Sequence, residues 1–204
     1  MVALLDALAA EPDPPTTVAD PVDGHIADSL SVLPLLERSP SRVADIGSGA
    51  GFPALPLAVA WPSSSFTLFE SQRRHAAIAE RLGRRAGLSN VRVLAVRVEE
   101  APELEAFELV TARAVASLAV LVEYAAPLLV SGGLFVAWKG ARDEAEERGG
   151  EVAAGMVGLS LERVVPVEPF PGAHSRHLHF FRKTGPTPDR FPRRPGMARK
   201  RPLA

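Results

Sequence analysis

Residues 43–53 place three glycines between an apolar strand pattern and an apolar helix pattern. Gly47, Gly49 and Gly51 allow the backbone to take positive φ and to approach a ligand that a Cβ atom would hold away. The spacing is G-x-G-x-G, whereas the dinucleotide-binding fingerprint G-x-G-x-x-G requires a third glycine at position 52, where the chain has Phe52. The stretch therefore predicts a strand, a tight turn and a helix N-terminus facing a polar ligand, and it disfavours a nicotinamide cofactor.

Glu70 is the second half of this signal, and it is needed because glycine-rich turns also occur in folds that bind no ligand. It ends a strand pattern over residues 65–69 and follows the first glycine by 23 positions. In a doubly wound sheet the second strand lies beside the first, so this carboxylate should face the glycine turn and accept both hydroxyls of a ribose. Pro53 and Pro56 remove amide donors from the next helical turn, which favours a nucleoside-like ligand without phosphates, such as S-adenosylmethionine.

Several further motifs follow one another in a fixed order. Residues 25–30 read H-I-A-D-S-L, residues 45–53 read D-I-G-S-G-A-G-F-P, residues 113–116 read R-A-V-A, and residues 139–140 read K-G. From about residue 21 to the C-terminus, the chain resembles the RsmG (GidB) family of bacterial small-subunit (16S) ribosomal RNA guanine-N7 methyltransferases. The resemblance implies an S-adenosylmethionine-dependent enzyme whose partner is small-subunit ribosomal RNA or the assembling small subunit.

Strand and helix patterns alternate along the chain and end in a hairpin, which is the layout of an α/β class I methyltransferase. We expect a Rossmann-like, seven-stranded, mostly parallel sheet with a C-terminal antiparallel hairpin. Helices are predicted from about residue 23 to 38, 71 to 86, 119 to 129 and 142 to 157. Strands are predicted over residues 43–46, 65–69, 91–96, 108–113, 134–139, 161–167 and 177–182.

The two ends of the chain differ from its middle. We expect an N-terminal leader and linker over residues 1–20, a methyltransferase domain over 21–186 and a basic C-terminal arm over 187–204. The arm holds six cations and four prolines around Phe191, a composition that predicts no core packing. It is either a solvated tail or a contact to RNA phosphates and bases. Truncation before Thr187 is therefore expected to weaken RNA binding and to leave cofactor affinity intact.

Composition excludes several classes of function. The 204 residues suit one catalytic domain, and long apolar runs are broken well short of a membrane span. The absence of cysteine excludes disulfides, thiolate metal ligands and pyrimidine C5 methylation through a cysteine nucleophile. No basic, apolar leader follows Met1, so we expect a cytoplasmic protein. We also expect it to hold no metal and to be a monomer. The net charge of −1 requires RNA affinity to come from local clusters.

The candidate site residues come from the strand ends and from the resemblance. Arg113 and Lys139, at the ends of two predicted strands, are the catalytic candidates. The alternative for Arg113 is a purely structural role, as the ion-pair partner of Glu99 or Asp45. Val98 and Glu99 should lie over the adenine. The cofactor-binding candidates are Asp45, Gly47, Ser48, Gly49, Gly51, Phe52, Glu70, Val98, Glu99 and Arg113. The RNA-binding candidates are His25, Arg176, His177, Arg193, Arg194, Arg199 and Lys200, with a basic helix flank of Arg73, Arg74, Arg81, Arg84 and Arg85.

The chemistry expected of this site is methyl transfer to a ring nitrogen. Guanine N7 carries a free lone pair, so no proton has to be removed before it attacks the sulfonium methyl. Methylation of the adenine amino group typically accompanies an Asn/Asp-Pro-Pro-aromatic turn, and the chain has R-A-V-A at residues 113–116. Two other classes remain open at this point: a methyltransferase acting on a protein or a small molecule, and a non-catalytic RNA-binding module.

Overall fold

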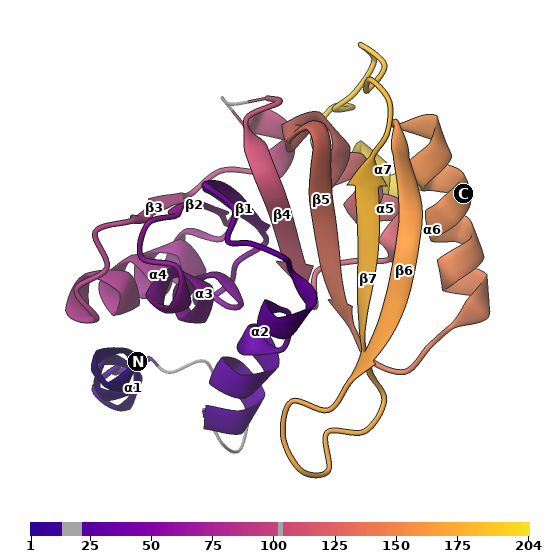
Figure 1. The fold of residues 1–204 in the computed structure, drawn as a ribbon. Helices are drawn as coiled ribbons and strands as arrows, with labels where there is room; N and C mark the ends of the chain where they lie inside the picture. The colour runs from indigo at the N-terminus through magenta and orange to yellow at the C-terminus, as the bar shows by residue number, and fades with distance from the viewer. Residues whose placement is uncertain (14–21, 102–103) are drawn as a thin grey trace.

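The computed structural model describes residues 1–13, 22–101 and 104–204. In these ranges, seven strands form one sheet in the order β3-β2-β1-β4-β5-β7-β6 (Figure 1). β1 to β5 are parallel, and β7 runs antiparallel to both β5 and β6. The strands are β1 (Arg42–Ile46), β2 (Ser65–Phe69), β3 (Val91–Leu94), β4 (Phe107–Arg113), β5 (Leu129–Lys139), β6 (Leu159–Val167) and β7 (Arg176–Lys183).

Helices cover both faces of the sheet, and the strand sequences reflect this. Side chains of a strand alternate between its faces, and β1 places Val43 in one buried cluster and Ala44 with Ile46 in the other. Strands buried on both sides are near-continuous apolar runs, as the sequence predicted for β1 and β2. The main helices are α1 (Val2–Ala9), α3 (Ala54–Ala60), α4 (Arg73–Arg85), α5 (Leu118–Ala125), α6 (Glu144–Met156) and α7 (Met197–Lys200).

The strand order reverses at β1, which fixes the place of the site. The chain leaves β1 toward β2 and β3, and it returns to the other side of β1 as β4. Because the connections that follow β1 and β4 run to opposite sides, a crevice is left outside the carboxyl ends of these two strands. The glycine turn follows β1 directly, so its position at this crevice results from the topology.

The helix predicted from about residue 23 to 38 is divided into three short pieces. They are the π-helical η1 (Val22–Ala27), the α-helical α2 (Asp28–Leu30) and the 3₁₀-helical η2 (Leu33–Leu35). The Ser29 hydroxyl donates to the His25 carbonyl, and Pro34 has no amide hydrogen to continue an α-helical ladder. A continuous helix was therefore the wrong prediction here.

The ends of the described chain pack against the domain. Leu4 and Leu8 of α1 are buried, and α1 contacts α4, while residues 14–20 of the predicted linker lie outside the described residues. Phe191 and Ala198 are buried in the same apolar cluster as α5. The prediction that the basic arm packs no core is therefore wrong. In the described ranges, no helix is long and apolar enough to cross a membrane.

Candidate cofactor and substrate site

The three glycines of the turn have different roles. All three have positive φ, at +62° for Gly47, +56° for Gly49 and +102° for Gly51. A Cβ on Gly51 would lie 2.5 Å from Leu55 of α3, and one on Gly47 would lie 2.7 Å from Val115. A Cβ on Gly49 would meet nothing within 4 Å. Gly47 and Gly51 thus permit close packing, while the backbone at Gly49 is open to a ligand.

A cleft of about 750 Å³ lies in front of this turn. Its size suits a nucleoside-containing ligand. Its walls come from the carboxyl ends of β1, β2 and β4 and from segments beyond them. The lining residues are Gly24, His25, Asp28, Ile46, Gly47, Ser48, Gly49, Phe52, Phe69, Glu70, Ser71, Gln72, His75, Val96, Arg97, Val98, Glu99, Arg113, Ala114, Val115, Tyr124, Arg176 and Arg199.

Glu70 faces the glycine turn, as the sequence predicted. Its Oε2 accepts a hydrogen bond from the Gly49 N–H at 2.9 Å, and its Oε1 accepts one from the Gln72 N–H at 2.7 Å. The residue is buried. Each carboxylate oxygen has two acceptor positions, so Glu70 is fixed in place and retains acceptors for ribose hydroxyls.

We expect Glu70→Gln to weaken S-adenosylmethionine binding about 10- to 100-fold, since hydrogen bonds to a charged acceptor contribute about 1–3 kcal/mol. Calorimetric titration measures the dissociation constant. Glu100→Gln is the matched control, because it makes the same change on η3 (Val98–Glu100) outside the cleft lining. Full affinity in Glu70→Gln would remove Glu70 from the cofactor site.

Asp45 is not on the cleft surface. The side chain is fully buried, and its Oδ1 accepts a hydrogen bond from Thr111 Oγ1 at 2.6 Å. Burial raises the pKa of this carboxyl to about 7 against the lowering effect of Thr111 and of Arg113. The structure therefore places Asp45 behind the glycine turn, where it joins β1 to β4, and Gly51 is likewise outside the lining.

The donor set of the cleft fits a nucleoside cofactor. Ser48 is buried and lines the cleft, and its hydroxyl has no hydrogen-bond partner among the described residues. The open backbone at Gly49 and the carboxylate of Glu70 lie beside it. Val98 and Glu99 line the same cleft, and their contact with an adenine stays a prediction. Together, the Ser48 hydroxyl, the Gly49 backbone and the Glu70 carboxylate can form hydrogen bonds to one elongated polar ligand.

Arg113 ends β4 and is held by the segment around α2. Its Nη1 donates to Asp28 Oδ2 at 2.7 Å and to the Gly24 carbonyl at 3.2 Å. The guanidinium lies 5.8 Å from the centre of the Phe52 ring, which stacks on His25 at 4.4 Å. Arg113 therefore forms its ion pair with Asp28. The alternative prediction, in which Arg113 serves only as the partner of Glu99 or Asp45, named the wrong carboxylates.

A second hollow of about 150 Å³ adjoins the cleft. Arg113 and Arg176 line both spaces, whereas Lys139 and His177 line only the smaller one. The smaller hollow is also bordered by Trp138, whose indole N–H donates to the Asp28 carbonyl at 2.9 Å. The structure thus brings both catalytic candidates, Arg113 and Lys139, to the smaller hollow, and of the two only Arg113 also lines the cleft.

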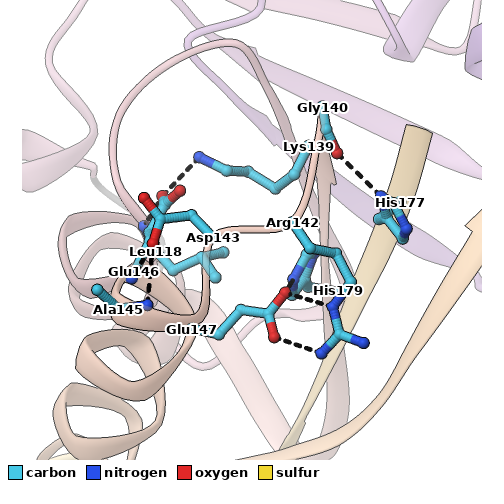
Figure 2. Close-up of polar contacts among 10 residues, drawn as sticks. All are labelled: Leu118, Lys139, Gly140, Arg142, Asp143, Ala145, Glu146, Glu147, His177 and His179. Carbon is cyan, nitrogen blue, oxygen red and sulfur yellow. Dashed lines mark hydrogen bonds and ion pairs between the residues drawn. The ribbon is translucent and has the colours of Figure 1, made fainter. Parts of the chain in front are cut away.

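Lys139 is directed toward α6 (Figure 2). Its Nζ lies 2.6 Å from Glu146 Oε1, which also accepts the Leu118 N–H at 2.9 Å. His177 contacts the Gly140 carbonyl through Nδ1 at 2.9 Å. These contacts order the loop after β5, and the roles of Lys139 and His177 toward a substrate stay predictions.

A buried histidine joins α6 to β7 beside this loop (Figure 2). His179 Nε2 lies 3.1 Å from Glu147 Oε1, and Arg142 forms a two-point ion pair with the same carboxylate. The Arg142 hydrogen bond and His179 hold the pKa of Glu147 at about 2, and burial lowers the pKa of His179. The cluster positions the N-terminus of α6, from which Glu146 reaches Lys139.

The predicted RNA-binding cations have different surroundings. Arg193 pairs with the buried Glu123. Arg194, Arg199 and Lys200 are all exposed, and of these three only Arg199 lines the cleft. The predicted basic flank of α4 is partly neutralised: Arg74 pairs with Asp13, and Arg81 and Arg85 pair with Glu11.

Sequence reasoning assigned no role to Tyr124. For Asp28 the resemblance favoured only a role near the cofactor, shared with His25, and did not identify its partner Arg113. Asp28 shares a helical face with His25 at a spacing of three, which was a usable signal. Tyr124 is the single tyrosine of the chain, in the apolar pattern of α5, and it borders the cleft. Burial and the nearby Glu99 raise its pKa. Nothing in the local pattern distinguished it from a core residue.

The fold and the position of the cleft define a class I methyltransferase. A solved structure of mitomycin 7-O-methyltransferase matches with a TM-score of 0.66 at 17% identity, covering 78% of this chain and 54% of the other. A predicted O-methyltransferase from Agrobacterium tumefaciens matches with a TM-score of 0.61 at 24% identity, covering 78% and 81%. At these identities the likeness concerns the fold.

Sequence comparisons give the family. A family model described as GidB, rRNA small subunit methyltransferase G, matches residues 14–176. Ribosomal RNA small subunit methyltransferase G of Chloroflexus aggregans is 42% identical over 183 residues, covering 88% of this chain and 76% of the relative. The protein of that name from Lacticaseibacillus paracasei is 38% identical over 187 residues, covering 88% and 77%. The chain belongs to the GidB family of methyltransferases, as the sequence motifs indicated.

Proposed function

We propose that this protein transfers a methyl group from S-adenosylmethionine to N7 of a guanine in small-subunit ribosomal RNA. The observation that supports it best is the Glu70 carboxylate, fixed by the Gly49 and Gln72 amides at the edge of the cleft. Gly47, Ser48, Gly49, Val98 and Glu99 would hold the cofactor with it. When bound, S-adenosylmethionine supplies an electrophilic methyl group. Family membership supports the ribosomal RNA substrate.

The chemistry requires positioning more than proton transfer. The N7 lone pair needs no base, so the residues around the site act by orienting the guanine against the methyl donor. Arg113 borders both the cleft and the smaller hollow, and its guanidinium can donate to guanine O6 or to a flanking phosphate. Asp28 and Phe52 hold that guanidinium in place.

The substrate has to present an accessible guanine. N7 lies in the major groove, which in A-form RNA is too narrow for side chains, so the target is unstacked or in a loop. Arg176 and His177 border the hollow next to Arg113 and are proposed to contact this part of the RNA. Arg194 and Lys200 are proposed as phosphate contacts. A cytoplasmic location, a monomeric state and the assembling small subunit as substrate stay predictions.

Incubation of the protein with labelled S-adenosylmethionine and small-subunit RNA, followed by nucleoside mass spectrometry, is expected to yield 7-methylguanine. Single-turnover rates should change little from about pH 6 to 9, because no base titrates and arginine stays charged. A label on adenine, uracil or protein would contradict the proposal. A steep rate loss with a pKa near 6.5 would indicate that a histidine acts as a base. Calorimetric binding of NAD without S-adenosylmethionine binding would contradict the cofactor assignment.

A further inference from the structure

The C-terminal strap, residues 190–204, borders the cleft through Arg199. We propose that this strap is part of the cofactor site, with Arg199 closing the nucleobase end of the cleft and supporting the glycine turn. The inference rests on the proposed function of the cleft as the S-adenosylmethionine site. It reverses the sequence-based expectation that removal of residues 187–204 leaves cofactor affinity intact.

The strap is anchored on α5 by both apolar and ionic contacts. Phe191 and Ala198 are buried in the cluster that contains α5. Arg193 Nε donates to Glu123 Oε1 at 2.6 Å, and the Glu123 side chain is only 2% exposed. Arg193 Nη2 also donates to the Arg201 carbonyl at 2.9 Å, which ties the two halves of the strap together. A buried carboxylate keeps such a partner in place, because losing it would leave a charge without a counterion.

A second contact joins the strap to the wall of the cleft. The Gly196 N–H donates to Glu99 Oε1 at 2.7 Å, and Glu99 lines the cleft in η3. Gly196 has φ of +79°, a conformation that other residues rarely adopt. The turn at this glycine therefore directs the strap from the Arg193 anchor back toward the residues that follow β3.

Arg199 connects the strap to the glycine turn. Its Nη2 donates to the Val115 carbonyl at 3.0 Å. The Val115 side chain in turn occupies the space that a Cβ on Gly47 would need, at 2.7 Å. Ala114, the residue before Val115, has φ of +57°, which is strained for a residue with a Cβ. An external hydrogen bond to this strained turn helps to hold Val115 over Gly47.

The position of Arg199 also allows it to contact the nucleobase of the cofactor directly. If Glu70 binds the ribose, the base points toward the residues beyond β3, where Val98, Glu99 and Tyr124 line the cleft together with Arg199. A planar guanidinium can stack on a purine or donate to its ring nitrogens. Arg194 and Lys200, which are also exposed, lie outside the cleft lining and are available to RNA.

The test measures S-adenosylhomocysteine binding by calorimetry in the full chain. Arg199→Ala is expected to weaken binding at least 10-fold, and Arg199→Lys, which keeps the charge without the planar fork, to recover only part of it. Arg201→Ala is the matched control, because it removes the same charge from an exposed residue of the strap outside the cleft lining. Its affinity should stay within 2-fold of the unsubstituted chain.

A second readout follows the strap itself. Amide hydrogen exchange at Gly196 and across α7 should slow when S-adenosylhomocysteine binds, because the ligand stabilises the wall to which Gly196 is bonded. If the unsubstituted chain binds and Arg199→Ala binds equally well, the inference is wrong while the proposed function stands. If the unsubstituted chain does not bind at all, both are wrong.

Discussion

Arg113→Ala is expected to lower the single-turnover rate of methylation about 10²- to 10³-fold, the usual effect of removing one preorganised charged donor from an active site. Cofactor affinity should fall much less, because the guanidinium lies at the boundary between the cleft and the smaller hollow. Rapid-quench assays give the rate, and calorimetry gives the affinity. Equal losses in both would show that Arg113 serves the cofactor and not the substrate.

The loss of Arg113 would also leave Asp28, which is buried, without its cation. An uncompensated buried carboxylate destabilises its surroundings, so the single variant confounds two effects. The double variant Asp28→Asn with Arg113→Ala separates them, since it removes the stranded charge as well. A double variant that is as slow as Arg113→Ala supports a direct role of the guanidinium. Recovery of the rate would assign the loss to the stranded carboxylate.

Asp45→Asn is expected to abolish a pH-dependent loss of unfolding free energy that reaches about 2–4 kcal/mol at pH 8 in the unsubstituted chain. Burial raises the pKa of Asp45 from 3.8 to about 7, so the folded protein retains a proton that the unfolded chain releases. The free energy of unfolding should therefore fall as the pH rises from about 4 to 7 and then level off. Asparagine removes this dependence and keeps an acceptor for the Thr111 hydroxyl.

Urea unfolding at pH 5 and pH 8 measures the effect. Asp189→Asn makes the same chemical change at an exposed residue and should shift the free energy of unfolding by less than about 0.5 kcal/mol at either pH. An unchanged pH dependence in Asp45→Asn would contradict the assignment. Asp45→Asn is also a control for the methylation rates. If the rate of the unsubstituted chain changes near pH 7 and that of Asp45→Asn does not, the change arises from Asp45 and not from a catalytic base.

The sequence by itself determined the sheet and the end of the cleft where Glu70 faces the glycine turn. The buried runs before Gly47 and Glu70 predicted two parallel neighbours, and their carboxyl ends necessarily lie at one edge of the sheet. The Gly49 amide lies 2.9 Å from the Glu70 carboxylate as a result. The positive φ that the glycines permit and the apolar pattern of the strands depend only on neighbouring residues in the chain. Both features can therefore be identified from the sequence.

Only the tertiary structure decided how the charged residues pair. Arg113 meets Asp28 across a separation of 85 residues, and Arg193 meets Glu123 across 70. Both partners were visible in the sequence, but periodicity gives the face of an element and not the element it packs against. The strap illustrates the same limit. Its composition predicted no core packing, yet burial of Phe191 and Ala198 in the apolar cluster that contains α5 outweighs the local preference of a Pro- and Arg-rich segment for solvent.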